Sequence, residues 1–140
     1  MRSLIGIDHG SKRTGFAVAD PLRIICEPLD TFEGPEEGLL DHIAGLLEER
    51  DVETFVVGLP LNMDGSEGPR CAEVRAFAKA LSARFDGVRV AFQDERLTTK
   101  VAEELMRDAG YGRQDRKAGR DGMSAVVILR DWMDAGEPPA

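Results

Sequence analysis

The stretch LIGIDHGSKRTGFAVAD, residues 4–20, decides the expected fold because it joins two apolar runs through a short glycine-rich turn. The two runs predict a pair of strands. Asp8 stands where the first strand ends, and a carboxylate there costs free energy unless a cation or a hydrogen-bond donor meets it. The glycines of the turn allow a ligand to come close, and Lys12 and Arg13 would meet an anionic group. The stretch therefore predicts a metal and phosphate site on a hairpin.

Beyond this hairpin, apolar runs of strand length alternate with stretches of helical spacing. The pattern predicts strands over 3–8, 14–19, 24–32, 54–59 and 88–93, and helices that begin at Pro35, after a cap at Ser66, near Val101 and at Asp121. Three opening strands, followed by strands that alternate with helices, indicate a mixed five-stranded sheet with helices on its faces. The expected fold class is α/β.

Length and composition are those of one globular domain. The chain has 140 residues, of which 42% are hydrophobic and 31% charged, and it is long enough to bury a core. We expect a single domain over 1–136 and a disordered tail over 137–140. No apolar run is long enough to span a membrane, and the N-terminus lacks a signal-peptide pattern. Cys26 and Cys71 have no paired spacing, which favours two free thiols and a cytoplasmic location.

The formal net charge of −8 argues against a nucleic-acid partner, but the charges are unevenly distributed. Residues 27–53 carry ten acidic side chains against one basic, a pattern that is typical of a solvated face. Residues 111–120 carry four basic side chains against one acidic. This basic stretch is expected to be a polar loop that could meet a phosphate backbone while the rest of the surface repels it.

Acidic side chains stand at three predicted element ends. Asp8 follows the first strand, Asp94 and Glu95 follow the last strand, and Asp121 opens the last helix. Ligands of such sheets bind outside the carboxyl ends of parallel strands, where these carboxylates could converge. Converging carboxylates repel one another unless cations neutralise them, and oxygen ligands of this kind suit Mg²⁺ or Mn²⁺. Two such ions can activate a water molecule and stabilise the leaving oxygen of a phosphodiester.

Each of these acids also has a purely structural interpretation. Asp8 could form an Asx-turn, and Asp121 could simply cap a helix. Asp94 and Glu95 point to opposite sides of their strand, so at most one of them is expected to bind a ligand. Because helices are expected on both faces of the sheet, this alternation does not choose between the two acids.

Other polar residues carry weaker signals. Arg96 could pair with a neighbouring acid or contact a substrate. Asn62 and Asp64 could bind a substrate or shape their own turn, and their spacing alone favours the turn. His9 and His42 are too isolated for a histidine-based metal site or a catalytic dyad.

Three motifs together resemble the YqgF family, whose members are described as pre-16S rRNA nucleases or Holliday junction resolvase-like proteins. The motifs are DHGSKRTGFA from Asp8, GLPLNMDG from Gly58 and DERLTT from Asp94, and the last helix from Asp121 also matches. The combination is specific, whereas the first motif alone would be weak, and the resemblance covers nearly the whole chain. It implies an RNase H-like fold with the first three strands antiparallel and the last two parallel.

The resemblance also implies a catalytic set. By motif position, Asp8, Glu95 and Asp121 would bind divalent metal, and the glutamate is preferred at the strand end because the related resolvases use one there. The chain departs from the family pattern at His9, where an apolar or aromatic residue is more common. It departs again at Ser124, where the last helix usually has alanine or another small apolar residue.

The function implied is metal-dependent hydrolysis of phosphodiester bonds in structured RNA, in 5′-end maturation of pre-16S rRNA. The metal ions would be Mg²⁺ or Mn²⁺. Substrate contacts would come from residues around the acidic set, namely Lys12, Arg13, Asn62, Asp64, Arg96, Arg116, Lys117 and Arg120. Expected partners are pre-rRNA or branched DNA, with ribosomal particles as a further candidate and no membrane. The chain would act as a monomer or a homodimer.

Three other functions remain open at this point. Holliday junction resolution would need two active sites, as in a two-fold dimer. A non-catalytic nucleic-acid-binding or regulatory module could keep the same fold. A fragment of an actin-like sugar or acetate kinase fits less well, because that two-lobed cleft needs a much longer chain and a second phosphate loop.

Overall fold

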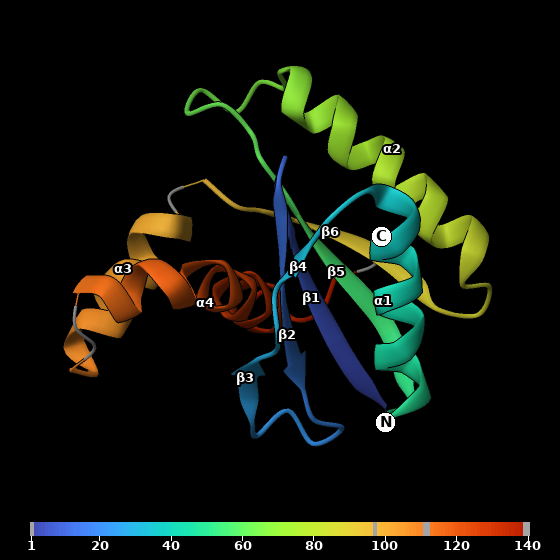
Figure 1. Cartoon of the computed structure of the whole chain (residues 1–140), viewed down its shortest axis with the longest axis horizontal. Coiled ribbons are helices and arrows are strands. Elements are labelled where there is room, and N and C mark those ends of the chain that lie inside the picture. The colour runs from blue at the N-terminus through green and yellow to red at the C-terminus, as the bar shows by residue number, and fades with distance from the viewer. Residues whose placement is uncertain (1, 97, 111–112, 139–140) are drawn as a thin grey trace.

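The computed structural model describes residues 2–96, 98–110 and 113–138, and for 98–100, 103 and 113–121 it describes the backbone alone. The elements follow one another along the chain as shown in Figure 1. They are β1 (Ser3–His9), β2 (Arg13–Ala19), β3 (Cys26–Pro28), β4 (Phe32–Glu33), α1 (Glu36–Glu48), β5 (Val52–Leu59), α2 (Pro69–Arg84), β6 (Arg89–Asp94), α3 (Thr98–Asp108) and α4 (Arg113–Asp134).

The strands form one mixed sheet in the order β3-β2-β1-β5-β6, and the short β4 also pairs with β2. The pairs β1–β2 and β2–β3 are antiparallel, whereas β1–β5 and β5–β6 are parallel. The predicted mixed sheet is therefore confirmed. One detail differs, since the run 24–32 forms two short strands rather than one. Pro28 ends the first of them because it has no N–H to donate to a ladder.

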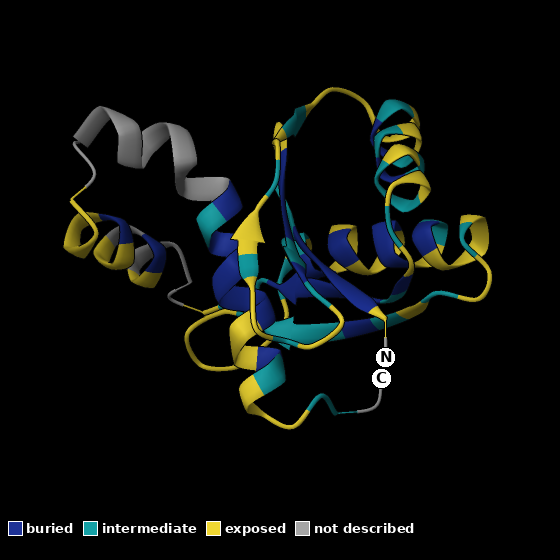
Figure 2. Cartoon of the chain, turned by 90° about the horizontal axis from the view of Figure 1, so that it is seen from below, coloured by how far each residue is buried: buried dark blue, intermediate teal, exposed yellow. Residues whose placement is uncertain are grey.

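Helices cover both faces of the sheet. α1 and α2 lie on one face, and α4 lies on the other with α3 packed against it (Figure 1). Figure 2 shows buried residues on the sheet and on the helix surfaces that meet it. Alternation along β1 separates the two cores, because Ile7 packs with α1 and α2 whereas Leu4 packs with α4. A Cβ at Gly6 would lie 2.8 Å from the carbonyl oxygen of Ala125, so α4 rests directly on β1.

Two helices begin at other residues than the sequence predicted. α4 begins at Arg113, so the expected loop over 113–120 is helical and Asp121 lies inside the helix rather than at its cap. Arg, Gln, Lys and Ala are all good helix formers, which is why a polar stretch without proline can continue a helix. α2 follows an N-cap at Gly68 with Pro69 in its first turn. The hydroxyl of Ser66, the expected cap, donates to Asp64 instead.

The end of the described chain is held by contacts rather than free. Glu137, which was expected in a disordered tail, forms an ion pair with Arg23 at 3.2 Å. The guanidinium of Arg89 donates to the carbonyl of Pro138. The tail is therefore anchored as far as Pro138, and residues 139–140 lie outside the described residues. The single domain over 1–136 stays a prediction.

Both cysteines are free thiols, as predicted. Cys71 is buried in the first turn of α2, and Cys26 is half-buried in β3. Trp132 is 1% exposed and belongs to the core between α4 and the sheet. Within the part of the chain that the structure describes, no helix is both long and apolar enough to cross a membrane.

Candidate functional site

The carboxyl ends of β1, β5 and β6 meet at one edge of the sheet, and two of the predicted acids lie there. Asp8 is the penultimate residue of β1, and Glu95 directly follows β6. Between them, β5 carries Gly58, which has no side chain to fill the space. A Cβ at Gly58 would lie 2.9 Å from the Cδ and Oε2 atoms of Glu95. The glycine therefore leaves room for the Glu95 carboxyl group to lie over β5.

Asp8 and Glu95 interact directly through a hydrogen bond between their side chains. Burial, followed by the charge and the hydrogen bond of Asp8, raises the pKa of Glu95 to about 9. At neutral pH the two carboxyl groups therefore share a proton. Two carboxyl groups this close together are suited to bind a divalent cation, which would replace the shared proton.

The structure distinguishes the two neighbouring acids at the end of β6. Alternation along β6 puts Glu95 on the α4 side with Ala91, whereas Asp94 lies on the opposite side. Asp94 pairs with Arg96, with N–O distances of 2.9 and 2.7 Å. The hydrogen bond from Arg96 lowers the pKa of Asp94. Geometry therefore brings Glu95, and not Asp94, to Asp8.

The third predicted acid, Asp121, belongs to α4, the helix that covers the same face of the sheet. Asp121 precedes Ala125 by one helical turn, and Ala125 and Ile128 both pack onto the sheet. The side chain of Asp121 lies outside the described residues. Among the described side chains, no group of three or more His, Cys, Asp and Glu could hold a metal ion. The described part of the site is thus the pair Asp8 and Glu95.

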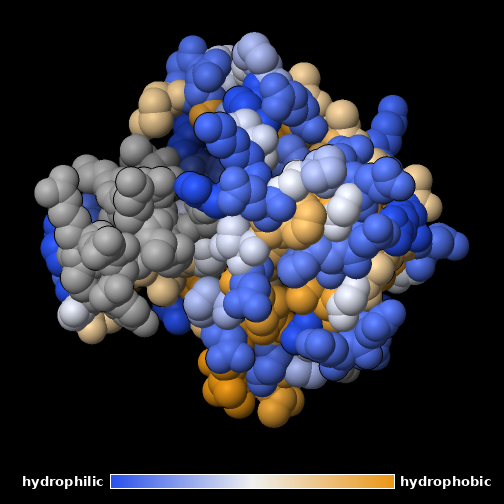
Figure 3. Space-filling model, viewed as in Figure 1, coloured by the Kyte–Doolittle hydropathy of each residue, from blue (hydrophilic) through white to orange (hydrophobic). Residues whose placement is uncertain are grey.

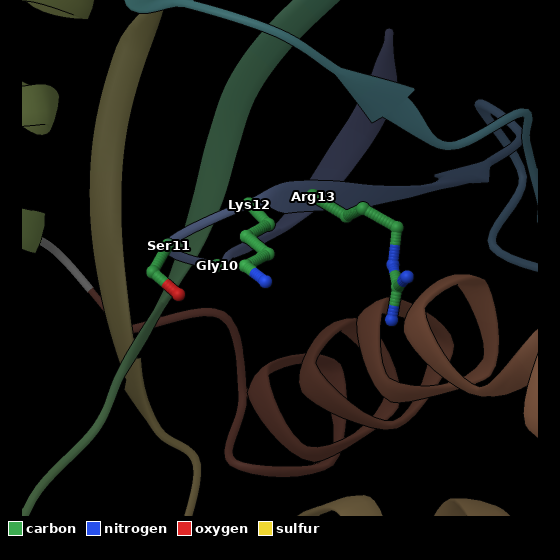
Figure 4. Close-up of a pocket in the computed structure, with 4 residues that line it drawn as sticks. All are labelled: Gly10, Ser11, Lys12 and Arg13. Atoms are coloured by element: carbon green, nitrogen blue, oxygen red, sulfur yellow. The ribbon is translucent and has the colours of Figure 1, made fainter.

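The turn between β1 and β2 forms an open hollow with a volume of about 200 Å³, lined by Gly10, Ser11, Lys12 and Arg13. A Cβ at Gly10 would lie 2.2 Å from the carbonyl oxygen of Arg13, so only glycine allows this tight turn. Figure 4 shows the Lys12 and Arg13 side chains extending from the turn on the side where α4 lies. Two cations beside the Asp8 end of β1 suit an anionic group such as a phosphate.

The loop between β5 and α2 is closed by its own hydrogen bonds. The Asn62 side chain donates to the Ser66 hydroxyl at 3.0 Å, and Asp64 accepts from the Ser66 backbone N–H at 2.9 Å. These bonds to Ser66 lower the pKa of Asp64. Arg96 holds the loop to the end of β6 by donating to the carbonyl of Met63 at 3.1 Å. Asn62 and Asp64 therefore shape a turn, as their spacing favoured. Arg96 pairs with its neighbouring acid Asp94, which was one of the two roles expected for it.

Sequence reasoning missed Arg70, which lies in the first turn of α2. Its guanidinium donates to the backbone carbonyl of His9 at 2.5 Å, and its positive charge acts on Glu95 by lowering its pKa against the larger effect of burial. The contact joins residues 61 positions apart, so no local pattern could have indicated it. Arg70 is therefore a third cation near the carboxylate pair.

His9, where the resemblance implied an apolar or aromatic residue, behaves as an aromatic one. Its ring stacks on Phe77 of α2 with centroids 4.5 Å apart and an interplanar angle of 25°. Burial and the charge of Arg70 lower the pKa of His9, which keeps the ring neutral. The histidine thus holds the end of β1 against α2.

The remaining predicted cations, Arg116, Lys117 and Arg120, lie on the first turns of α4 rather than on a loop. Their side chains are outside the described residues. Their contact with a substrate stays a prediction.

Solved structures with a similar fold include two resolvases. T. thermophilus RuvC in complex with a Holliday junction substrate matches with a TM-score of 0.60 at 15% identity, covering 96% of each chain. The fowlpox virus Holliday junction resolvase matches with a TM-score of 0.55 at 10% identity, covering 95% of this chain and 98% of that chain. At such identities the likeness shows the fold alone, and it confirms the predicted RNase H-like architecture.

Relatives of higher identity carry the name pre-16S rRNA nuclease. The protein from Anaeromyxobacter sp. (strain Fw109-5) is 44% identical over 131 residues, covering 93% of this chain and 95% of the relative. The protein from Ruegeria pomeroyi is 41% identical over 133 residues, covering 94% and 86%. That from Halalkalibacterium halodurans is 41% identical over 137 residues, covering 96% of each.

These names agree with the predicted class of enzyme, a hydrolase of nucleic acid, and they confirm the resemblance drawn from the three motifs. The family model of RuvX, described as a Holliday junction resolvase, matches residues 2–135. The chain therefore belongs to the RuvX family of Holliday junction resolvase-like proteins.

Proposed function

We propose that the protein is a metal-dependent nuclease that cleaves structured RNA in the maturation of the 5′ end of pre-16S rRNA. The observation that carries the proposal is the hydrogen-bonded pair of Asp8 and Glu95 at the carboxyl ends of the parallel strands. The names of the relatives support the substrate, and cytoplasm is the location that fits it.

In this proposal Asp8, Glu95 and Asp121 hold Mg²⁺ or Mn²⁺. The chemistry of the residues fits such ions, because carboxylate oxygens are their preferred protein ligands and because the described pair is close enough to share one proton. When bound, the metal would lower the pKa of a water molecule and stabilise the leaving oxygen of the phosphodiester. Asp8 and Glu95 would release their shared proton to water when the metal binds, and their carboxylates would orient the reacting groups.

The cationic residues of the site hold the substrate. Lys12 and Arg13 line the hollow next to β1 and bind a backbone phosphate there. Arg96 adds a charge at the rim while it holds the loop that contains Asn62 and Asp64. The first turns of α4 contribute Arg116, Lys117 and Arg120 to the nucleic-acid path.

The test is cleavage of an end-labelled pre-16S rRNA leader with Mg²⁺, with Mn²⁺ or with EDTA. We expect cleavage that needs metal and is lost in Asp8→Asn and Glu95→Gln. Asp94→Asn is the matched control, because Asp94 is the neighbouring carboxylate that pairs with Arg96 on the other side of the strand. Equal activity in Glu95→Gln and Asp94→Asn would contradict the assignment of the site.

A second candidate function is resolution of four-way DNA, which the family description and the likeness to RuvC favour. A four-way DNA junction belongs in the same assay for this reason. Symmetric cuts in the junction by a two-fold dimer, with the RNA leader left intact, would favour this function. Binding of both substrates without cleavage of either, under metal-bound conditions, would instead indicate a non-catalytic module.

A further inference from the structure

The strands β1 and β5 separate at the edge of the sheet where the carboxylate pair lies. Their parallel ladder ends at Ile7 and Val57, although β1 continues to His9 and β5 continues to Leu59. Beyond this point β1 keeps its pairing with β2, and β5 keeps its pairing with β6. In the described structure, the end of β1 that carries Asp8 therefore has no strand partner on its β5 side.

Arg70, in the first turn of α2, holds this end of β1 from one face of the sheet. Its Nη2 group donates to the backbone carbonyl of His9 at 2.5 Å and lies 3.4 Å from the ring Nδ1. Its Nη1 group donates to Glu73, which fixes the guanidinium to its own helix. The His9 ring also stacks on Phe77 of α2. Because α2 follows β5 along the chain, these contacts connect the two strands where their ladder has ended.

The carboxylate pair spans the same separation from the other face. Alternation along β1 puts Asp8 with Leu4 on the α4 side, and Glu95 lies over Gly58 of β5. The hydrogen bond between the two carboxyl groups needs their shared proton, which a bound metal would replace. Once that proton has left, the position of Asp8 depends on how firmly the end of β1 is held.

The start of α2 is a polar part of the surface. Figure 3 shows mainly hydrophilic atoms at the top of the molecule, where α2 begins in Figure 1. The side chain of Arg70 is 35% exposed and that of Glu73 is 57% exposed. The need to cover an apolar core therefore does not explain why the guanidinium bonds to the carbonyl of His9.

We propose that Arg70 is a positioning residue, which fixes the end of β1 so that Asp8 stays beside Glu95 when a divalent metal ion binds. This role rests on the metal site of the proposed function. Arginine suits it because the planar guanidinium presents five N–H donors in fixed directions, so that one group bonds to His9 while another bonds to Glu73.

A purely electrostatic role of Arg70 predicts the opposite result. Its charge acts on the carboxylate pair, since it lowers the pKa of Glu95 against the larger effect of burial. A divalent ion brings two charges where the shared proton brings one, so charge alone would make metal binding tighter when Arg70 is removed. Positioning predicts weaker metal binding, because Asp8 is then no longer held beside Glu95.

The experiment measures Mn²⁺ binding to the full chain without RNA, from the EPR signal of the free ion. Arg70→Met keeps most of the aliphatic stem without the charge or the donors, and Arg70→Lys keeps the charge without the planar fork. Arg84→Met is the matched control, because it removes the same charge from the last turn of the same helix, where Arg84 pairs with Asp41 at 2.7 Å. Urea denaturation shows which variants are folded, and Arg70→Lys carries the comparison if Arg70→Met is not.

We expect Arg70→Met to bind Mn²⁺ about tenfold or more weakly than wild type, as is typical when a residue that orients a metal ligand is lost. Arg70→Lys should bind it less weakly than Arg70→Met but still more weakly than wild type, and Arg84→Met should match wild type.

Unchanged or tighter binding in Arg70→Met would overturn the proposal, and so would unchanged binding in Arg70→Lys. Equal weakening in Arg84→Met would assign the effect to net charge and would overturn it as well. These outcomes leave the nuclease proposal intact. A wild-type protein that binds no Mn²⁺ would instead overturn the metal site itself, and the role of Arg70 with it.

Discussion

The two ends of β1 handle charge in opposite ways. At the carboxyl end, Asp8 and Glu95 are held together, so that burial and like charge raise the pKa of Glu95. At the amino end, Arg23 is half-buried between Glu53 and Glu137, and each charge has an opposite partner. One end of β1 therefore carries two like-charged groups that disfavour each other's ionisation, and the other end carries a cation that is paired with two carboxylates. An arrangement that costs stability persists where it serves a ligand, and the opposite end offsets part of that cost.

The largest effect we expect is a loss of catalysis in Glu95→Gln, which also removes the unfavourable interaction between the two carboxyl groups at the carboxyl end of β1. Glu95→Gln keeps the shape and hydrogen-bonding capacity of the side chain but cannot ionise to the carboxylate that would bind a metal ion. Turnover should fall by well over about 100-fold, since even residues behind a metal ligand are typically worth 10- to 100-fold. In EDTA at pH 8, the same variant should unfold with a free energy on the order of 1–2 kcal/mol higher than wild type.

Single-turnover cleavage and urea denaturation measure the two quantities. Asp94→Asn should behave differently, losing little activity and gaining no stability, because its charge is paired with Arg96. A Glu95→Gln protein that is less stable than wild type without metal would show that the carboxylate pair carries no strain.

The next effect is on stability at the other end. Arg23→Met keeps most of the aliphatic stem but leaves Glu53 and Glu137 without their cation. Removing one partner of a buried pair costs about 3–5 kcal/mol, and partial exposure of the two glutamates reduces this to about 2–3 kcal/mol. Arg2→Met is the matched control, because Arg2 pairs with Asp51 at 3.6 Å in an exposed position and should cost under about 0.5 kcal/mol. Equal losses would mean that the Arg23 cluster contributes no more than a surface pair.

The sequence predicted the two ends of β1 to different extents. Asp8 and Glu95 follow apolar runs, and the sheet topology that those runs imply brings strand ends together, so the pair was predictable. The choice of Glu95 over Asp94 depended on which face α4 covers, which strand alternation alone does not tell. Arg70 and Arg23 were not predictable as cations of either end, because their partners are distant in sequence. Each contact exists only after α2 and the chain end are in place.

The helix boundaries were missed for a different reason. The polar residues over 113–120 favour a helix as well as a loop, and no proline or apolar stripe decides between the two. Asp121 was therefore placed at a helix cap that does not exist. Its spacing of one turn from Ala125 is the same in the predicted helix and in the longer one that is observed.

A smaller effect is the pH dependence of stability in the absence of metal. The folded-state pKa of Glu95 is raised from 4.5 to about 9, so the folded protein holds a proton that the unfolded chain releases. Its contribution to stability is therefore fully present below pH 4.5 and is lost as the pH rises towards 9. We expect the free energy of unfolding in EDTA to fall by on the order of 1–2 kcal/mol between pH 6 and 8.5.

Urea denaturation across this range checks the slope, and Mg²⁺ should flatten it because the metal replaces the proton. Glu95→Gln should flatten it without metal. A slope that is the same in wild type and in Glu95→Gln would assign the pH dependence to other groups.

The smallest effect we expect is on the free energy of unfolding, at Ser124, an unfavourable buried group that has no predicted role in binding a ligand. Ser124 in α4 is 1% exposed, and its hydroxyl has no hydrogen-bond partner in the described part of the structure. A buried hydroxyl without a partner costs about 1 kcal/mol or more, so Ser124→Ala should raise the free energy of unfolding by about 1 kcal/mol. Unlike Glu95→Gln, it should leave metal-dependent cleavage unchanged. Thermal denaturation and the cleavage assay measure both. A gain in stability accompanied by lost cleavage would place the Ser124 hydroxyl in the site, and strain at this position would then serve function as it does at Glu95.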